Sequence, residues 1–188
     1  MNQVIFEQFA TLLNERFSKS VYTTEDSIRY TFFTAVLDSG IYQHHELIME
    51  YPHPAIPGAE VDTYIPATES RTGEVIEFKY HRQIPSGKNP PRPQKAGHLF
   101  KDIDRLQRFE NGIEINRIFI YVTDGEMANY MDNKSNGLYD FFRLPEGERL
   151  NIGEQYINGK SDTFQKASGT KLDAVVECVL SRSLAAEH

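Results

Sequence analysis

Two short segments in which polar and apolar side chains alternate constrain the fold of this chain more than any other feature. Residues 59–65 and 74–80 both alternate in this way, and the polar segment 68–73 separates them. A period of two is typical of a β-strand with one buried face, and a short polar connection favours antiparallel pairing. The sequence therefore predicts a pair of adjacent strands near the middle of the chain.

The segments that follow extend this pair into a larger sheet. Residues 94–108 carry apolar side chains at helical spacing, and residues 115–123 form an apolar run typical of a central strand. Residues 82–93 contain four prolines and a glycine, so we expect a loop there. The length of the path from strand 74–80 through the helix to strand 115–123 predicts a crossover between parallel strands.

Further elements are expected on both sides of this centre. Apolar spacing predicts one helix over residues 3–18 and a second that starts after Thr23 or Thr24 and ends at Ser39-Gly40. The other expected elements are a strand at 45–51, short helices at 126–131 and near 136–143, and a tail from 171 onward that is ambiguous between helix and strand.

The bulk composition favours one soluble globular domain that spans residues 1–188. The chain is 39% hydrophobic and 25% charged, which excludes a disordered chain. No apolar run approaches the ~20 residues of a membrane span, and the N-terminus lacks the pattern of a signal peptide. Cys178 is the single cysteine, so no internal disulfide can form, and we expect a cytoplasmic protein.

Charge is distributed unevenly along the chain. The net charge is −7, yet residues 79–108 hold eight Lys and Arg residues against two aspartates, so this segment is basic by +6 and the remainder is acidic by −13. Such a segment is typical of a phosphate-binding surface. A solvated helix whose cations pair with acids elsewhere is the equally weighted alternative.

Three residues of the predicted strand pair carry the chemistry. Asp62 lies in the first strand, and Glu77 and Lys79 lie two apart in the second, so the latter two project from one face. If the strands pair, Asp62 and Glu77 can share a hard cation, for which carboxylate oxygens are the preferred ligands. Lys79 can then orient a water molecule and offset developing negative charge.

Val61-Asp62 and Glu77-Phe78-Lys79 together resemble the motif of the PD-(D/E)xK nuclease superfamily, which has the restriction-endonuclease-like fold. The resemblance covers residues 24–123 and implies an α/β fold with an α-β-β-β-α-β core, in which helices flank a central mixed sheet. Residues 124–188 are then a C-terminal elaboration. The residue before the first acid is proline in the name of the motif, whereas it is Val61 in this sequence.

This resemblance implies a function, a cofactor and further site residues. The expected activity is Mg²⁺-dependent hydrolysis of DNA phosphodiester bonds in restriction, repair or defence, with Mn²⁺ also accepted. Glu25 matches the helical glutamate that many members add to the metal site. The expected partners are DNA and a second copy or a specificity subunit, with no membrane. The expected DNA-binding residues are Gln94, Lys95 and Lys101 of the crossover helix and Arg92 in the loop before it.

Other interpretations of the same residues stay open at this point. Glu77 and Lys79 can form the solvent face of an ordinary strand, and Glu60 shares a face with Asp62 and can replace it as a ligand. The helix dipole alone favours an acid at Glu25. The alternative functions are a non-catalytic nucleic-acid-binding module of the same fold and a structural protein with an accidental motif. His44-His45 are interpreted as surface residues, since they lack the ligand spacing of zinc sites.

Overall fold

The computed structural model of the chain describes residues 1–84, 87, 89–169 and 172–182. Lys88, which contributes to the basic segment, lies outside the described residues. The described residues cluster into two compact units. Unit 1 comprises Met1–Tyr80 and Arg105–Tyr121, and unit 2 comprises His81–Asp104 and residues 122–182. The assignment of residues 1–188 to one domain stays a prediction.

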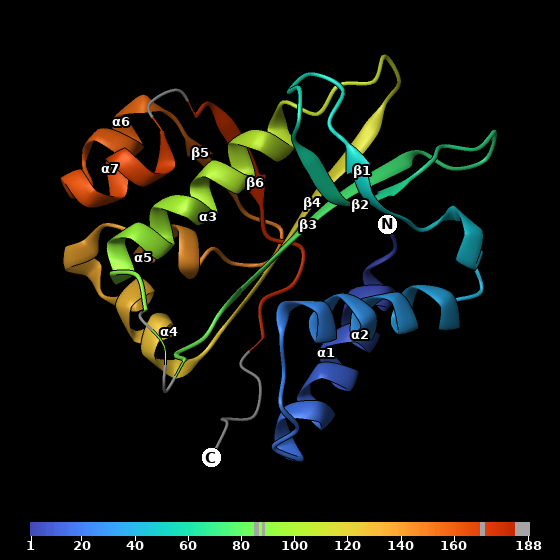
Figure 1. Ribbon diagram of the computed structural model, residues 1–188, viewed down its shortest axis with the longest axis horizontal. Helices are drawn as coiled ribbons and strands as arrows, with labels where there is room; N and C mark the ends of the chain where they lie inside the picture. Colours follow the sequence, from blue (N-terminus) through green and yellow to red (C-terminus); the bar gives the residue numbers. More distant parts are fainter. Residues whose placement is uncertain (85–86, 88, 170–171, 183–188) are drawn as a thin grey trace. The chain divides into compact units, whose positions relative to one another are not determined.

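Two helices begin unit 1 and pack against each other. Helices α1 (Gln3–Ser18) and α2 (Glu25–Asp38) are drawn in blue in Figure 1. Each buries apolar side chains on one face. Thr24 starts α2 through a capping box, in which its hydroxyl accepts the Ser27 N–H and the Ser27 hydroxyl accepts the Thr24 N–H. The rings of Phe9 and Phe32 meet edge to face at 5.4 Å. Both predicted helices are confirmed.

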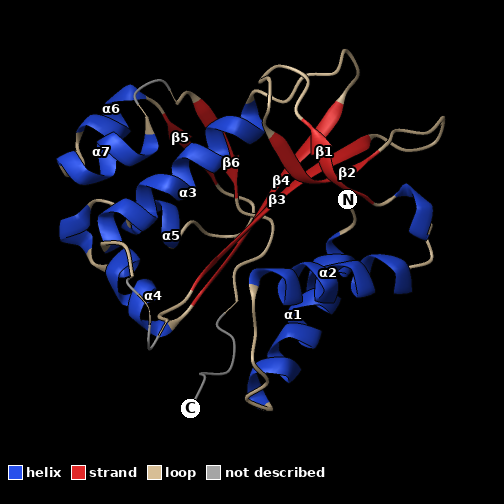
Figure 2. Cartoon of the chain, in the orientation of Figure 1, coloured by secondary structure: helices blue, strands red, loops and turns tan. Residues whose placement is uncertain are grey.

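The central sheet has four strands in the order β1–β2–β3–β4 (Figure 2). Their bounds are β1 Ile48–Pro52, β2 Glu60–Ile65, β3 Gly73–His81 and β4 Ile115–Thr123. The β1–β2 and β2–β3 pairs are antiparallel, and the sheet is mixed, so β3 and β4 form the parallel pair. Helix α3 (Arg92–Gln107) connects them. The expectation of a mixed sheet with flanking helices is therefore confirmed.

The two faces of β3 have different neighbours in unit 1. Phe78 packs edge to face on Phe32 and Phe33 of α2, at centroid distances of 5.4 and 6.5 Å. Val75 belongs to a second apolar cluster, to which Leu106 at the end of α3 and Phe109 also belong. Glu77 shares the strand parity of Val75, so its side chain emerges on the face covered by the end of α3.

The predicted strand at residues 45–51 is wrong at its beginning. A 3₁₀-helix, η1 (His44–Glu46), occupies its first residues, and β1 starts at Ile48. The Glu46 carboxylate accepts the Gln43 N–H at 2.7 Å and binds Arg71 at 2.6 Å. These contacts stabilise a local turn. The turn competes with strand formation because the Gln43 N–H is already paired with the Glu46 side chain.

The predicted loop over residues 82–93 is also too long, because α3 begins at Arg92 rather than at Gln94. Pro93 lies in the first turn of the helix. A proline is tolerated there, since the N–H it lacks has no partner within the helix.

Unit 2 contains short elements that pack on α3. Rings of Phe141 and Phe164 lie 4.8 and 5.2 Å from that of Phe100. At Gly97, an added Cβ lies only 2.5 Å from the Phe164 carbonyl oxygen, so glycine is required for this close approach. The elements of this unit are α4 Gly125–Asp132, η2 Lys134–Asn136, α5 Tyr139–Phe142, β5 Arg149–Ile152, α6 Glu154–Asn158, α7 Asp162–Ser168 and β6 Ala174–Glu177.

Strands β5 and β6 form a separate antiparallel sheet of two strands. The sequence was ambiguous for β6, and β5 had no predicted counterpart. The predicted helix at 126–131 is confirmed as α4, whereas the segment near 136–143 contributes only the single turn of α5. Within the described ranges, no helix has the length and apolar character needed to span a membrane.

Candidate active site

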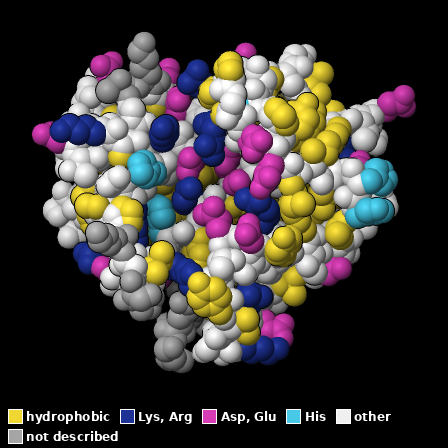
Figure 3. Space-filling model, in the orientation of Figure 1, with side chains coloured by type: hydrophobic (Ala, Val, Ile, Leu, Met, Phe, Trp, Pro, Cys, Tyr) yellow, Lys and Arg dark blue, Asp and Glu magenta, His cyan; other side chains and the backbone are white. Residues whose placement is uncertain are grey.

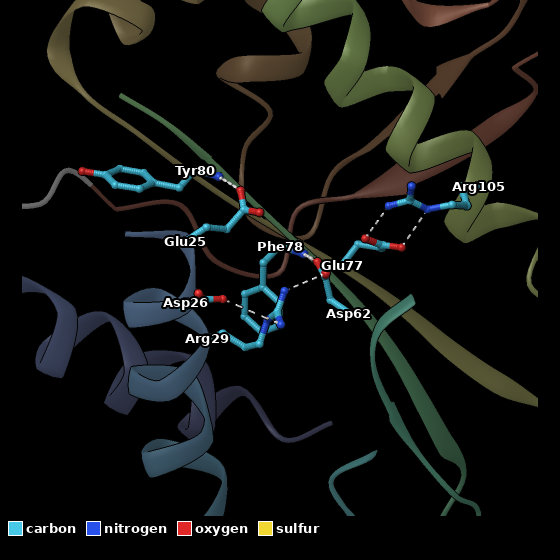
Figure 4. Close-up of polar contacts among 8 residues, drawn as sticks. All are labelled: Glu25, Asp26, Arg29, Asp62, Glu77, Phe78, Tyr80 and Arg105. Carbon is cyan, nitrogen blue, oxygen red and sulfur yellow. Dashed lines mark hydrogen bonds and ion pairs between the residues drawn. The ribbon is translucent and has the colours of Figure 1, made fainter. Parts of the chain in front are cut away.

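Asp62 stands at the point where the regular pairing of β2 with β3 ends. That pairing stops at Thr63 and Ile76, and the same register carried one residue further places Asp62 across from Glu77. Instead of a backbone carbonyl, the Asp62 Oδ2 atom accepts the Phe78 N–H at 2.8 Å (Figure 4). The Asp62 side chain thus satisfies a strand amide that the end of the ladder leaves without a partner.

Glu25 accepts a hydrogen bond from the next backbone amide on the same edge of β3, that of Tyr80. It is the first residue of α2, and its Oε2 atom accepts the Tyr80 N–H at 2.7 Å (Figure 4). Amides two residues apart point to the same edge of a strand, so Asp62 and Glu25 line one edge of β3 in succession. Burial raises the pKa of Glu25, and the Tyr80 N–H and the charge of Lys79 oppose that rise.

Glu77 is the most strongly perturbed acid of the site. Its side chain is 2% exposed and binds Arg105 through both oxygens, at 3.0 Å from Nε and 2.8 Å from Nη2. Burial raises the pKa of Glu77 to about 8, the charge of Asp62 and a hydrogen bond with it act in the same direction, and Arg105 opposes them. The two carboxyl groups are therefore close enough to share a proton or a cation.

Lys79 completes the predicted catalytic set. It lies two residues beyond Glu77 in β3 and is half-buried. Its charge lowers the pKa of Glu25, so the ammonium acts on the acidic edge of β3. The structure thus assembles Asp62, Glu77, Lys79 and Glu25 around a short stretch of one strand. Glu60, the alternative ligand, is exposed at the start of β2.

Sequence reasoning missed the two arginines that neutralise these acids. Arg29 Nη2 lies 2.8 Å from Asp62 Oδ1, and Arg105 binds Glu77. Arg29 follows Glu25 by four residues on α2, a spacing that places both on one helix face. That spacing was the available signal. Nothing local to Arg105 indicates a partner 28 residues away.

The donor set fits a hard divalent cation in its chemistry. Asp62 and Glu77 supply carboxylate oxygens, which magnesium prefers, and the raised pKa of Glu77 shows that this buried group favours a neutralised state. Among the described residues, no group of three or more His, Cys, Asp or Glu side chains is arranged to hold a metal ion. Glu25 is directed to the Tyr80 N–H.

Charged side chains of both signs also occur outside this centre. On the face drawn in Figure 3, acidic and basic side chains are intermixed over the middle of β3 and β4. The expected DNA-binding residues lie on α3 in unit 2. Arg92 pairs with Glu126, and Lys95 donates to the Arg82 carbonyl at 3.3 Å. Lys101 is exposed, and Gln94 is half-buried.

Comparisons with protein-family models, with curated proteins and with solved structures found no match to this chain.

Proposed function

We propose that this chain is a metal-dependent deoxyribonuclease of the PD-(D/E)xK superfamily, with Asp62, Glu77 and Lys79 as its catalytic centre. The observation that carries the proposal is the buried Glu77 carboxylate beside Asp62, with a pKa raised to about 8. Two acids held side by side, Glu77 buried and Asp62 half-buried, favour a cation between them, because their charges repel more strongly than in water. Functional sites commonly contain such perturbed groups.

The topology supports the same proposal. The order α2–β1–β2–β3–α3–β4 repeats the α-β-β-β-α-β core of the superfamily. Both acids of the motif lie on adjacent antiparallel strands, and the lysine follows the second acid on the same strand face. If the Asp…Glu-x-Lys pattern were accidental, nothing would require the two acids to lie on adjacent strands or Glu77 to be buried.

Each residue has a distinct role in this proposal. Asp62 and Glu77 bind the cation, and Glu25 joins them by moving from the arrangement described above, in which it accepts the Tyr80 N–H. Magnesium, when bound, supplies a Lewis acid and a more acidic water, and manganese has similar ligand preferences. Lys79 orients the attacking water by hydrogen bonding and stabilises negative charge that develops on the phosphate.

The two arginines define the metal-free state of this site. Arg105 and Arg29 hold the carboxylates in place and neutralise them. A cation at Glu77 either displaces Arg105 or shares the carboxylate oxygens with it, since a carboxylate offers about four lone-pair positions. DNA phosphates are the natural next partners for guanidinium groups that a cation releases.

Basic residues of α3 supply the remaining contacts with DNA in this proposal. Arg92, Lys95 and Lys101 bind backbone phosphates, and Gln94 contributes an amide. Such contacts position a nucleic acid without reading its sequence. Hydrolysis of both strands with one centre per chain favours a homodimer or a partner subunit.

A cleavage assay on supercoiled and linear DNA tests the proposal, with magnesium, with calcium and with chelator. Wild-type protein is expected to cut in magnesium only. Asp62→Asn and Glu77→Gln should lose both cleavage and cation binding, whereas Lys79→Ala should bind the cation and lose about a hundred- to a thousandfold in rate. Glu114→Gln, at an exposed acid before β4, is the control and should stay active. Equal cleavage in chelator contradicts the metal mechanism.

One observation favours a second function, a non-catalytic nucleic-acid-binding module of the same fold. Arg29 and Arg105 already satisfy Asp62 and Glu77, so the acids have a structural use as partly buried ion pairs. Calorimetric titration with manganese separates the two functions. The nuclease requires saturable binding that Asp62→Asn abolishes, and the binding module requires none.

A further inference from the structure

A cavity of about 410 Å³ lies within unit 2, and none of its lining residues belongs to the acidic site described above. Its walls come from the segment after β3, from the first turns of α3 and from α4. Its volume is within the range of small-molecule sites. Arg92 and Lys95, which the sequence assigned to nucleic-acid binding, and Tyr130 on α4 all line it.

The walls of this cavity are held in place by the chain itself. Pro90, Pro91 and Pro93 have fixed φ angles. The Asn89 side chain accepts the Ile84 N–H at 3.0 Å and donates to the Ile84 carbonyl at 2.9 Å, which closes the preceding loop. Ligands bind more tightly to walls that do not need to be ordered on binding.

Asp124 connects the remaining two walls. Its Oδ1 atom caps α4 by accepting the Met127 N–H at 2.9 Å, and its Oδ2 atom accepts the Gln83 N–H. The start of α4 and the segment after β3 are thereby tied to one side chain. The cavity is therefore formed before any ligand arrives.

The lining favours a flat, uncharged ring. The proline rings, the Met127 side chain and the ring of Tyr130 provide apolar and aromatic surface. The two cationic residues of the lining are balanced by Asp124 and Glu126, and Arg92 pairs directly with Glu126. The lining as a whole therefore carries no net formal charge, so charge alone does not select a free phosphate as the ligand. A group with an aromatic face and a polar edge matches it better.

Nucleobases have this combination of a π-face and hydrogen-bonding edges. A base stacked on an aromatic side chain gains binding free energy whatever its identity, because every base has a π-face. Lys95 at the same cavity provides a cation for the phosphate that accompanies each base in a strand. Gln83 supplies an amide, which can donate to and accept from a base edge.

We infer that this cavity binds one unpaired nucleobase of a DNA strand, with the ring stacked on Tyr130. The inference rests on the proposed nuclease function and names its substrate class as DNA with an unpaired nucleotide. Gln83 follows Lys79 by four residues in the sequence, so the cavity and the catalytic lysine belong to one continuous stretch of chain.

Binding of labelled oligothymidylate to the full chain in chelator tests this inference, since no cleavage is expected there. Wild-type protein should bind the single strand more tightly than a duplex of equal length and more tightly than thymidine monophosphate. Tyr130→Leu should weaken strand binding between about five- and a hundredfold, and Tyr130→Phe should restore it. Tyr139→Leu changes another half-buried tyrosine of unit 2 outside the cavity and should have no effect.

Three results overturn the inference. They are equal strand affinity of folded Tyr130→Leu and wild-type protein, stronger binding of duplex than of single strand, and equal affinity for thymidine monophosphate and the strand. Photo-crosslinking of wild-type protein to an iodouridine oligonucleotide avoids reliance on a variant that fails to fold. Mass spectrometry should locate the adduct at Tyr130, and adducts confined to other residues also overturn it.

The same experiments keep this inference separate from the proposed hydrolysis. Strand binding that depends on Tyr130, without cleavage in magnesium, refutes the nuclease and leaves the cavity as a base-binding site. Cleavage that is unaffected by Tyr130→Leu, with unchanged strand affinity, refutes the cavity and leaves the nuclease.

Discussion

The carboxylate of Asp62 accepts the backbone N–H of Phe78 at 2.8 Å and at the same time pairs with Arg29. One side chain thus closes the edge of β3 and carries a charge for the proposed cation. A loss of function after replacement of Asp62 can therefore arise either from the lost hydrogen bond to β3 or from the lost charge.

Two substitutions at Asp62 make this separation. Asp62→Asn keeps an oxygen that can accept the Phe78 N–H but removes the charge, so cation binding should be lost with a small change in the free energy of unfolding. Asp62→Ala also leaves the amide and Arg29 without their acceptor and should destabilise by a further ~1–3 kcal/mol. Denaturant unfolding and cation titration measure both effects. Equal stability of the two variants contradicts the structural role of the Asp62–Phe78 bond.

The pKa of Glu77 predicts how stability depends on pH in chelator. Its folded-state value of about 8 lies above the ordinary value of 4.5, so the protonated form is favoured by folding. The contribution of Glu77 is fully present below about pH 4.5 and is lost as pH rises toward 8. Over this window, wild-type protein should lose stability relative to Glu77→Gln by up to about 1.4 kcal/mol per pH unit.

Urea unfolding of both proteins between pH 5 and 9 gives this difference directly. Glu77→Gln also changes the contact with Arg105, but that cost is independent of pH and appears as a constant offset. A difference between the two proteins that does not vary with pH contradicts the raised pKa.

Arg105 should compete with divalent cations for Glu77. Arg105→Gln removes the charge that binds both Glu77 oxygens, so calcium and manganese should bind more tightly, while the chelated protein should be destabilised by about 1–3 kcal/mol through the lost hydrogen bonds. Added calcium should therefore raise the melting temperature of Arg105→Gln more than that of wild-type protein. Calorimetry and thermal unfolding measure the two effects.

Lys101→Gln is the matched control for Arg105, because it removes a charge from an exposed position of the same helix. It should leave cation affinity and melting temperature near those of wild-type protein. Weaker cation binding in Arg105→Gln shows instead that Arg105 supports the cation site.

Gly97→Ala should destabilise unit 2 by about 1–3 kcal/mol through overpacking. The added methyl group meets backbone atoms of Phe164 and Ser168 in α7, which cannot move without shifting that helix. Gly125→Ala at the start of α4 is the control, since an added Cβ there meets no atom within 4 Å. Urea unfolding of both variants tests the contrast, and equal stabilities contradict the close contact between α3 and α7.

Local sequence was sufficient for those elements whose patterns are long and whose ends are marked. The apolar stripe of residues 3–18 and the cap candidates Thr23 and Thr24 predicted α1 and α2, because helix spacing and capping involve residues only three or four apart. The alternation around Asp62 and Glu77 predicted β2 and β3 for the same reason. The proximity of these two acids followed once the strands were taken as a pair.

Only the tertiary structure decided the contacts that join distant segments. Arg71 binds the Glu46 carboxylate, 25 residues away in the sequence, and stabilises the turn that replaces the beginning of the predicted strand. Arg105 meets Glu77 across 28 residues, and the short strands β5 and β6 gain their hydrogen bonds only from each other. Such contacts depend on where the chain returns in space, which no local spacing encodes. The pairing of each acid with an arginine was therefore invisible in the sequence, although the acids themselves were not.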